Sequence, residues 1–413
     1  MNLYIDPGTG SMLFAVMIGL VGFVTYFARV VWIKIKYVVS RGKVDKVSLA
    51  KIPLLIYAES KTYWNVFMPI CRELDNRGYD FEYWTASQDD PAFSHSEFSH
   101  MKVRFIGEGN KAFSKLNLVQ ANVILSTTPG LNVYQWKRSQ AADYYVHIMH
   151  SANEVAAYRM FGLDFYDAVL VSGQYNMDDI RVLEKKRNLP PKDLKVVGMP
   201  YMDELKARID NSERPKHDRT CVLLAPSWGP NSLFNKFGSK ILDELVKCDV
   251  DIIVRPHPQT LKSETEMITP LMEKYPDSDR LRWDRSSSNF ESLHEADIMI
   301  SDFSGVIFDF ALAFDKPIIY SNTDFKTDCF DLHWLDKTPW TLEALPKMGL
   351  EVTDENISNL GDLIKRCLND ESFKKGRDAA GKETWECRGE GAKLIADYVV
   401  EKSKALSSAK KRK

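Results

Sequence analysis

From residue 52 onward, short apolar runs alternate with amphipathic stretches of helical period. Residues 52–59 (IPLLIYAE) predict a strand, and residues 63–78 predict a helix that its glycine ends. Further runs of strand length follow, namely DFEYWTAS, MKVRFIG, ANVILST, YYVHIMH, YDAVLVSG and LKVVG. Because apolar strands alternate with helices, the pattern predicts a parallel sheet with helices on both faces.

A charged, proline-containing stretch, residues 206–219, interrupts the alternation and is interpreted as an interdomain linker. The alternation then restarts with the strands CVLLAPSW, VDIIVRPHP, ADIMIS and KPIIYSN. We therefore predict two Rossmann-like α/β domains, at 47–205 on the acceptor side and at 220–397 for a nucleotide donor, with a polar tail at 398–413. The strand carboxyl ends of two such domains are expected to face a shared cleft, where ligands bind.

The N-terminal segment has a different pattern, since residues 11–28 carry no charge. Residues 12–33 as a helix would be about 33 Å long at ~1.5 Å per residue, which is enough to cross a bilayer. Only Asp6 precedes this run, whereas Lys34, Lys36, Arg41, Lys43 and Lys46 follow it. We expect residues 1–46 to be a transmembrane anchor with a basic flank, in a single-pass protein of the cell membrane whose catalytic domains are cytoplasmic. A cleaved signal peptide and a buried helix are the alternatives.

Composition narrows the classes of partner. The 413-residue chain has a net charge of −2, so no global basic field indicates nucleic-acid binding. Its six cysteines form no CxxC pair and no Cys/His cluster with zinc spacing. Scattered reduced thiols are expected, no metal site is predicted, and a need for a divalent metal stays open.

The segment after strand ADIMIS is the strongest candidate site. Ser301, Asp302, Ser304 and Gly305 belong to a turn that opens a helix, and the N–H groups at a helix start suit a diphosphate. Asp302 or Ser304 could instead only cap that helix. Asp309 lies on the apolar helix, where an unpaired carboxylate is costly, so a ribose hydroxyl or an internal hydrogen bond is its expected partner.

Two other strand ends carry candidate ligands of a nucleotide. Arg255 and His257 follow strand VDIIV, and an arginine fork matches phosphate oxygens. They indicate an anion site, with an exposed surface loop as the alternative. Ser227 and Trp228 follow strand CVLLA, where the hydroxyl could reach a phosphate and the indole could stack on a base, wall the cleft or pack in the core.

Two histidines lie near the end of the strand YYVHIMH. Strand alternation places His147 and His150 on opposite faces, so they are not expected to hold one metal. His150 falls where the strand ends, and its imidazole suits a general base for a hydroxyl nucleophile. His147 is expected to be a core residue.

At these residues the chain resembles the CDP-glycerol glycerophosphotransferase family, the teichoic-acid polymerases and their relatives. The resemblance covers about residues 51–397 and is carried by His150 and by the segments GMPYMD, APSW, RPHP and SDFSG. It implies a GT-B fold, two Rossmann-like domains around a cleft. It also implies that His150 is the base and that the donor phosphates lie near Arg255, His257, Ser301, Asp302 and Ser304.

The implied activity is transfer of glycerol phosphate, or a related polyol phosphate, from CDP-glycerol to a membrane-linked acceptor in cell-surface polymer synthesis. Ser151 stands where the family often has Gly, and Tyr201 stands where it often has Arg. These departures leave the polyol and the acceptor open. A GT-B glycosyltransferase or epimerase that uses a UDP-sugar is the enzymatic alternative, and a catalytically silent membrane scaffold is the alternative from another class.

Overall fold

The computed structural model describes residues 51–215, 217–286, 288–302, 304–322 and 327–411. Residues 52–413 form one compact unit. The predicted transmembrane anchor, residues 1–46, lies outside the described residues. Among the residues that are described, no helix is both long enough and apolar enough to cross a membrane.

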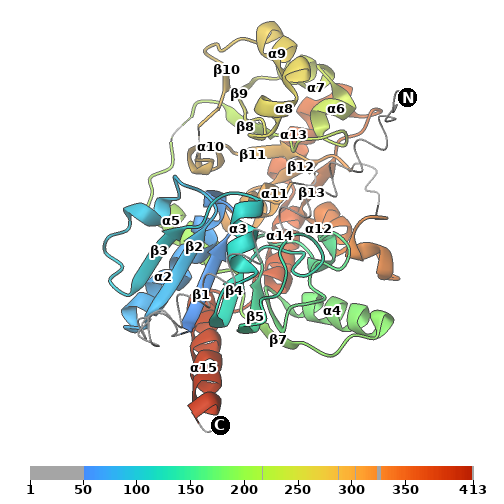
Figure 1. Ribbon diagram of the computed structural model, residues 1–413. Helices are drawn as coiled ribbons and strands as arrows, with labels where there is room; N and C mark the ends of the chain where they lie inside the picture. The colour runs from blue at the N-terminus through green and yellow to red at the C-terminus, as the bar shows by residue number, and fades with distance from the viewer. Residues whose placement is uncertain (1–50, 216, 287, 303, 323–326, 412–413) are drawn as a thin grey trace, which may run out of the picture. The chain divides into compact units, whose positions relative to one another are not determined.

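The first half of the unit is built on a seven-stranded parallel sheet in the order β3-β2-β1-β4-β5-β6-β7 (Figure 1). The strand bounds are β1 (Ile52–Ala58), β2 (Phe81–Thr85), β3 (Met101–Phe105), β4 (Ala121–Ser126), β5 (Ala142–Ile148), β6 (Ala168–Val171) and β7 (Asp193–Val196). Successive strands are added in one direction from β1 to β3 and in the opposite direction from β4 to β7, so the switch point lies between β1 and β4. Ligands of such sheets bind beyond the carboxyl ends of the strands at this point.

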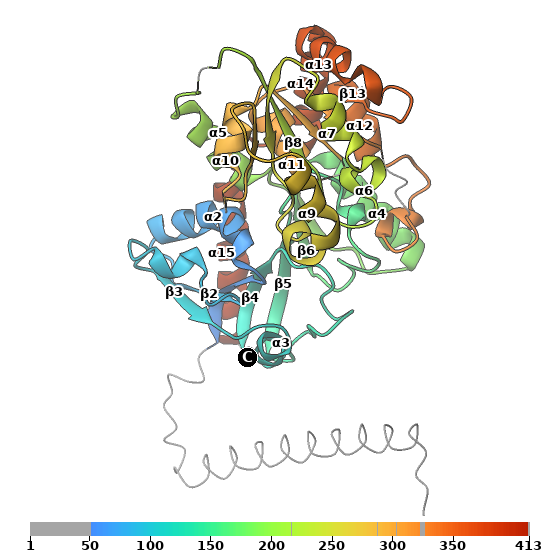
Figure 2. The ribbon, with the colours of Figure 1, turned by 90° about the horizontal axis from the view of Figure 1, so that it is seen from above.

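Strand alternation decides what each face of this sheet buries. Leu54 and Ile56 of β1 pack in a cluster with α2 (Trp64–Asn76) and α15 (Gly391–Lys411), which lie beside each other in Figures 1 and 2. Val399 and Val400 of α15 belong to the same cluster. Residues 398–411 therefore continue a helix that packs on the sheet as far as Leu406, and the prediction of a polar tail is wrong for that packed part.

The second half contains a six-stranded parallel sheet in the order β10-β9-β8-β11-β12-β13. Its strand bounds are β8 (Thr220–Ala225), β9 (Val250–Val254), β10 (Leu281–Trp283), β11 (Ile298–Ser301), β12 (Ile318–Tyr320) and β13 (Gly349–Glu351). The switch point of this sheet lies between β8 and β11. Two parallel α/β sheets confirm the two α/β domains of the predicted fold class.

The two sheets share one apolar cluster. Leu55 and Tyr57 of β1 belong to the same cluster as Leu223 of β8 and Ile307 after β11. The opposite face of the second sheet packs on α6 (Leu233–Phe237), α7 (Lys240–Leu245), α9 (Thr265–Lys274) and α13 (Leu360–Asn369).

The remaining helical segments connect these strands. They are η2 (Lys61–Tyr63), η3 (Pro91–Ser94), α3 (Asn110–Leu116), η4 (Val155–Ala157), α4 (Gln174–Arg187), α5 (Pro200–Asp210), α8 (Thr260–Ser263), α10 (Phe290–Glu295), α11 (Val306–Phe308), η5 (Asp309–Ala313), η6 (Asp331–Trp334), α12 (Trp340–Met348), η7 (Ile357–Asn359) and α14 (Glu371–Thr384). Helix α5 runs to Asp210, so residues 206–210 of the predicted linker are helical.

Candidate active site

His150 lies beyond the carboxyl end of β5, next to the switch point of the first sheet. Its Nδ1 is 2.9 Å from the hydroxyl of Thr127, which follows β4, and 3.4 Å from the hydroxyl of Tyr158. Its ring meets the ring of Tyr63 edge-on, with 5.2 Å between the centroids. Among the described residues no protein partner of Nε2 is found. The ring is thus held on one side while its other nitrogen is available.

Burial sets the charge of this imidazole. The loss of water around His150 lowers its pKa to about 4, although a hydrogen bond from its ring to the Thr127 backbone opposes the shift. At neutral pH the ring is therefore uncharged and can accept a proton.

His147 is fully buried on β5, as expected of a core residue. Its Nε2 lies 3.3 Å from the hydroxyl of Tyr158, and its Nδ1 has no hydrogen-bond partner in the described part of the chain. Burial lowers its pKa well below the usual value, and repulsion between the protonated forms of His147 and His150 acts in the same direction. The expectation that the two histidines lie on opposite faces is wrong, because both rings contact the same Tyr158 hydroxyl. His150 lies past the strand end, where the alternation stops.

At the second switch point, Ser301 and Asp302 have partners within the protein. The Ser301 hydroxyl donates to the Ala225 carbonyl at 2.6 Å. The fully buried carboxylate of Asp302 accepts the backbone N–H groups of Ser227, at 3.0 Å, and of Leu233, at 2.8 Å. Burial raises the pKa of Asp302, while N–H groups that include that of Ser304 act to lower it.

These contacts fix the loop after β8 to the turn after β11. They correspond to the capping alternative for Asp302, and they turn two side chains predicted to touch phosphate toward the protein. Among the described residues of the turn, Ser304 and Gly305 are partly exposed.

The helix after this turn is short, because the three residues of α11 pass directly into the π-helical segment η5. Asp309 begins η5 and accepts a hydrogen bond from the Tyr201 hydroxyl at 2.6 Å. Burial raises the pKa of Asp309 to about 6, against the effect of that hydrogen bond. The internal hydrogen bond, rather than a ribose hydroxyl, is the partner that the structure shows.

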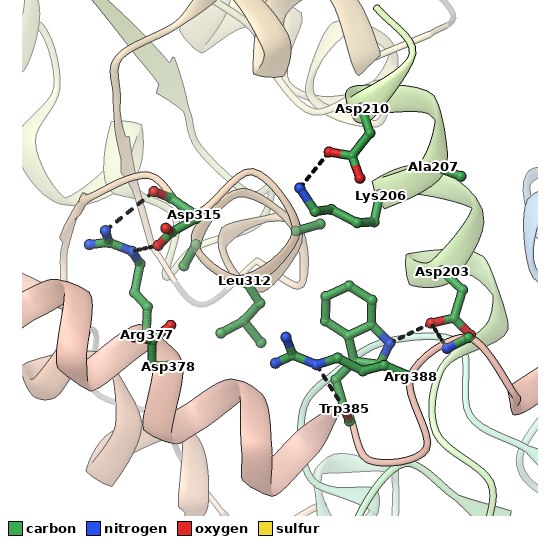
Figure 3. Close-up of a pocket in the computed structure, with 13 residues that line it drawn as sticks. Asp203, Lys206, Ala207, Asp210, Leu312, Asp315, Arg377, Asp378, Trp385 and Arg388 are labelled. Carbon is green, nitrogen blue, oxygen red and sulfur yellow. Dashed lines mark hydrogen bonds and ion pairs between the residues drawn. The ribbon is translucent and has the colours of Figure 1, made fainter.

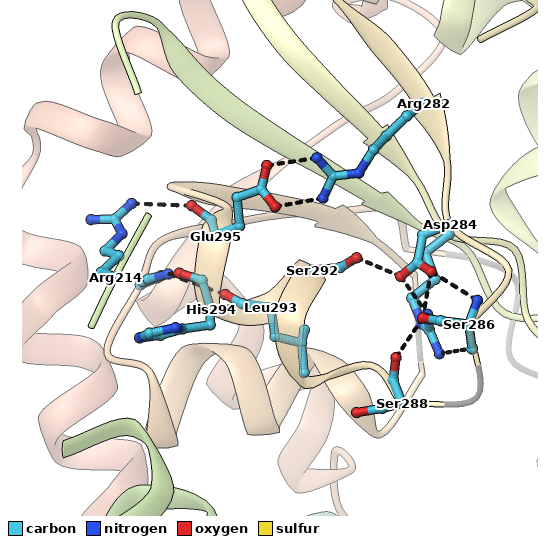
Figure 4. A network of polar contacts seen from close by, with 11 residues as sticks. Arg214, Arg282, Asp284, Ser286, Ser288, Ser292, Leu293, His294 and Glu295 are labelled. Carbon is cyan, nitrogen blue, oxygen red and sulfur yellow. Dashed lines mark hydrogen bonds and ion pairs between the residues drawn. The ribbon is translucent and has the colours of Figure 1, made fainter. Parts of the chain in front are cut away.

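Arg255 is committed to a neighbouring loop. Its guanidinium is 2.5 Å from the carboxylate of Asp284 and donates to the Ser286 carbonyl at 2.9 Å. Figure 4 shows Asp284 at the centre of this network, where it also accepts from Ser292. Burial would raise the pKa of Asp284, but hydrogen bonds from Ser286, Ser292 and Arg255 outweigh it and lower the pKa to about 2. The Arg255 guanidinium therefore binds the segment after β10 and is not available to a ligand.

His257 and Trp228 lie together at the carboxyl ends of β9 and β8. Their rings are stacked, with centroids 6.3 Å apart and planes inclined by 29°. Trp228 is half exposed, so one aromatic surface is available for stacking. His257 accepts the N–H of Gln259 at Nδ1, and burial lowers its pKa. Ser227 is buried, and its contribution is the N–H bond to Asp302.

The segments that follow the two switch points come close to each other at Gly305 and Ser151. A methyl group built on Gly305 would lie 3.5 Å from Cβ of Ser151, which is an ordinary van der Waals distance. The turn that carries His150 therefore faces the turn that carries Ser304 and Gly305. This arrangement unites the predicted base with the predicted phosphate-binding backbone.

A pocket of about 570 Å³ lies elsewhere, between α5, η5 and α14 (Figure 3). Most of its charged groups are satisfied within the protein. Lys206 pairs with Asp210, Arg377 pairs with Asp315, and Asp203 accepts the indole N–H of Trp385. This pocket is separate from the candidate active site, since its lining includes neither His150 nor the turn at 301–305. The described residues contain no group of three or more His, Cys, Asp or Glu side chains able to hold a metal ion.

Sequence reasoning missed Thr127, Tyr158 and Tyr63 as neighbours of His150. Thr127 had a detectable signal, since ANVILSTT places polar residues directly after an apolar strand. Tyr158 and Tyr63 had none, because they reach the ring through tertiary contacts.

Residues 147–328 match the family described as CDP-Glycerol:Poly(glycerophosphate) glycerophosphotransferase. This region includes His150 and the turn at 301–305. No curated protein matches the chain significantly.

Solved structures share the fold at low sequence identity. The wall teichoic acid polymerase TagF aligns over 92% of this chain and 98% of its own, with a TM-score of 0.55 and 16% identity. A UDP-GlcNAc 2-epimerase from Neisseria meningitidis, bound to UDP-GlcNAc, aligns over 84% of this chain and 99% of its own, with a TM-score of 0.53 and 13% identity. The family match confirms the resemblance inferred from the sequence, and over residues 147–328 the chain is similar to the CDP-glycerol glycerophosphotransferases.

Proposed function

We propose that the enzyme transfers glycerol phosphate, or a related polyol phosphate such as ribitol phosphate, from a CDP-activated donor to a membrane-linked acceptor in cell-surface polymer synthesis. The observation that carries this proposal is the closeness of Gly305 to Ser151, which brings the segment that carries His150 beside the turn after β11. The family match over residues 147–328 supplies the substrate class.

The reaction requires one proton transfer and one displacement at phosphorus. The acceptor hydroxyl oxygen attacks the β-phosphorus of CDP-glycerol, a new P–O bond forms, and the bond to the CMP oxygen breaks. The hydroxyl proton passes to Nε2 of His150, whose low pKa keeps the ring neutral before the reaction. CMP leaves with the electron pair of the broken bond.

Positioning and electrostatics supply the rest of the catalysis. We assign Ser304 and Gly305, the partly exposed residues of the turn, to the donor phosphates. His257 lies near this edge of the sheet and can stabilise phosphate charge, while the exposed face of Trp228 is suited to the cytosine ring. Asp302, Ser301 and Arg255 act indirectly, because their contacts hold the loops that carry these groups.

Ligand titration tests this assignment against the alternatives. Calorimetry of the full-length protein in detergent with CDP-glycerol, CDP-ribitol, CMP and UDP-GlcNAc should show binding of a CDP-polyol that is tighter than that of UDP-GlcNAc. Preference for UDP-GlcNAc would favour a glycosyltransferase or epimerase. Absence of binding by all four ligands would favour a catalytically silent scaffold.

The same proposal includes the site of action. Residues 12–33 are proposed to cross the cell membrane once and to leave the catalytic domains in the cytoplasm, since the basic residues follow the apolar run. Such a tether would hold the enzyme where a lipid-linked acceptor resides.

A further inference from the structure

We propose that Thr127 is a positioning residue that fixes the tautomer of His150, with the proton on Nδ1 and the lone pair on Nε2. The inference rests on the proposed function for its catalytic meaning, since only a base needs that lone pair. Its structural part concerns hydrogen bonds within the first domain.

The direction of each hydrogen bond follows from the number of available protons. The Thr127 hydroxyl has one proton, and it lies 2.9 Å from the carbonyl oxygen of Ile148. A carbonyl can only accept, so the hydroxyl donates there. The same hydroxyl oxygen lies 2.9 Å from Nδ1 of His150 and has only lone pairs left for that contact. Nδ1 must therefore carry the proton.

The second neighbour of Nδ1 fits the same assignment. The Tyr158 hydroxyl lies 3.4 Å from Nδ1 of His150, and its oxygen can accept from that N–H. Burial raises the pKa of Tyr158, which keeps the phenol protonated. Besides Tyr158, the titratable groups that face or act on this region are Tyr63, His147 and Glu59, the last through Tyr63.

The position of Thr127 makes this arrangement a property of the fold. Thr127 directly follows β4, and Ile148 ends the neighbouring strand β5, so parallel pairing brings the hydroxyl and the carbonyl together. His150 follows β5 by two residues and folds back over the same hydroxyl. One threonine thus connects two strand ends and orients the imidazole that follows them. In a neutral imidazole with a protonated Nδ1, Nε2 is the acceptor, as a general base requires.

Two substitutions separate the hydroxyl from the shape of the side chain. Thr127→Val keeps the branched shape and removes the hydroxyl, whereas Thr127→Ser keeps the hydroxyl. Ser403→Ala is the matched control, because it removes a buried hydroxyl that donates to the Pro53 carbonyl at 2.7 Å, at the other end of the sheet.

The direct readout is the nitrogen-15 NMR spectrum of the full-length protein labelled on histidine, at a pH where His150 is neutral. We expect the wild type, Thr127→Ser and Ser403→Ala to show His150 with a protonated Nδ1 only. Thr127→Val should show a mixture of tautomers. It should also lower kcat for CDP-glycerol by about tenfold to 10²-fold, by analogy with the loss of a hydrogen-bond partner of a metal-binding histidine, with KM for the donor unchanged.

The outcomes distinguish the role of Thr127 from the proposed function. An unchanged spectrum and an unchanged kcat in Thr127→Val would overturn the role of Thr127. If the wild type has the expected tautomer but does not turn over CDP-glycerol, the proposed function fails while the hydrogen-bond assignment stands. Should Thr127→Val fail to fold, Thr127→Ala removes the same hydroxyl without the branched side chain and gives the same test.

Discussion

At the scale of single residues, the proposed chemistry depends on a histidine that is kept neutral by its surroundings. Burial lowers the pKa of His150 to about 4 in the unliganded protein. A base of such low pKa is weak, so binding of a negatively charged donor has a specific consequence. The diphosphate should stabilise the imidazolium and raise the pKa toward neutrality.

This shift can be measured by following the His150 ring protons by NMR as the pH is changed. We expect a pKa near 4 without ligand and a higher value with CDP-glycerol bound. Because the folded-state pKa lies below the ordinary value of 6.5, the stability that His150 contributes is present above pH 6.5 and is lost as the pH falls toward 4. A pKa near 6.5 in both states would contradict the burial of this ring.

Residue-level prediction from the sequence was uneven for a physical reason. His150 and the turn at 301–305 could be placed, because strand ends are visible in the apolar pattern. The direction of the Arg255 side chain could not be predicted, because its partner Asp284 follows a different strand. The hydrogen bond between Asp309 and Tyr201 could not be predicted either, because the two residues are distant in sequence. Partners of this kind depend on the tertiary fold rather than on local sequence.

At the scale of elements, the turn after β11 and the turn after β5 form one unit. Gly305→Ala should change turnover little, since its methyl group meets Ser151 at 3.5 Å. Gly305→Val adds bulk that must displace the His150 turn, and a displacement of about 1 Å at a reacting centre can cost about 10²-fold in rate. Steady-state kinetics with CDP-glycerol measures both.

The contact also predicts a rescue. Ser151→Gly removes the side chain that the valine would meet, so the double variant Gly305→Val with Ser151→Gly should regain part of the lost rate. If the double variant is as slow as Gly305→Val alone, crowding against Ser151 is not the cause of the loss.

The ion pair between Arg255 and Asp284 gives a second element-scale prediction. Arg255→Ala leaves a partly buried carboxylate without its cation and should lower the free energy of unfolding by about 1–3 kcal/mol. Combined with Asp284→Ala, the loss should be smaller than the sum of the two single losses, as in coupled pairs. Urea denaturation of the four proteins measures this coupling.

The sequence-based expectation for the same residue gives the contrary outcome. If Arg255 contacts the donor phosphates directly, Arg255→Ala should weaken CDP-glycerol binding without a loss of stability. Calorimetric titration of the same variants distinguishes these two roles.

Prediction of the elements themselves succeeded where strands are fully buried. The strands β1, β4, β8 and β11 read as continuous apolar runs because helices cover both faces of their sheets. The strands β10 (LRW) and β13 (GLE) have three residues each, one of them charged, so no apolar run marks them in the sequence. The end of α15 was missed because its polar residues hide a packed face, where the buried Ser403 bonds to Pro53.

At the scale of the whole molecule, the proposed topology is open to a direct test. A reporter protein that functions only in the cytoplasm should be active when it is fused after Lys413. Removal of residues 1–46 should release a folded protein from the membrane. A C-terminal reporter that is active only outside the cell would contradict the topology. Unfolding of the truncated protein would place that segment in a core.

The central claim is that this chain transfers a polyol phosphate and that His150 is the base. The most direct measurement is the transfer of label from CDP-glycerol, labelled in glycerol, to an acceptor in isolated membranes, with CMP release followed in the same samples. With the wild type we expect label in the acceptor and an equal amount of released CMP. His150→Ala should reduce both by about 10²-fold or more at unchanged donor affinity. Label transfer that persists at the wild-type rate in His150→Ala, or no transfer by the folded wild type, would contradict it.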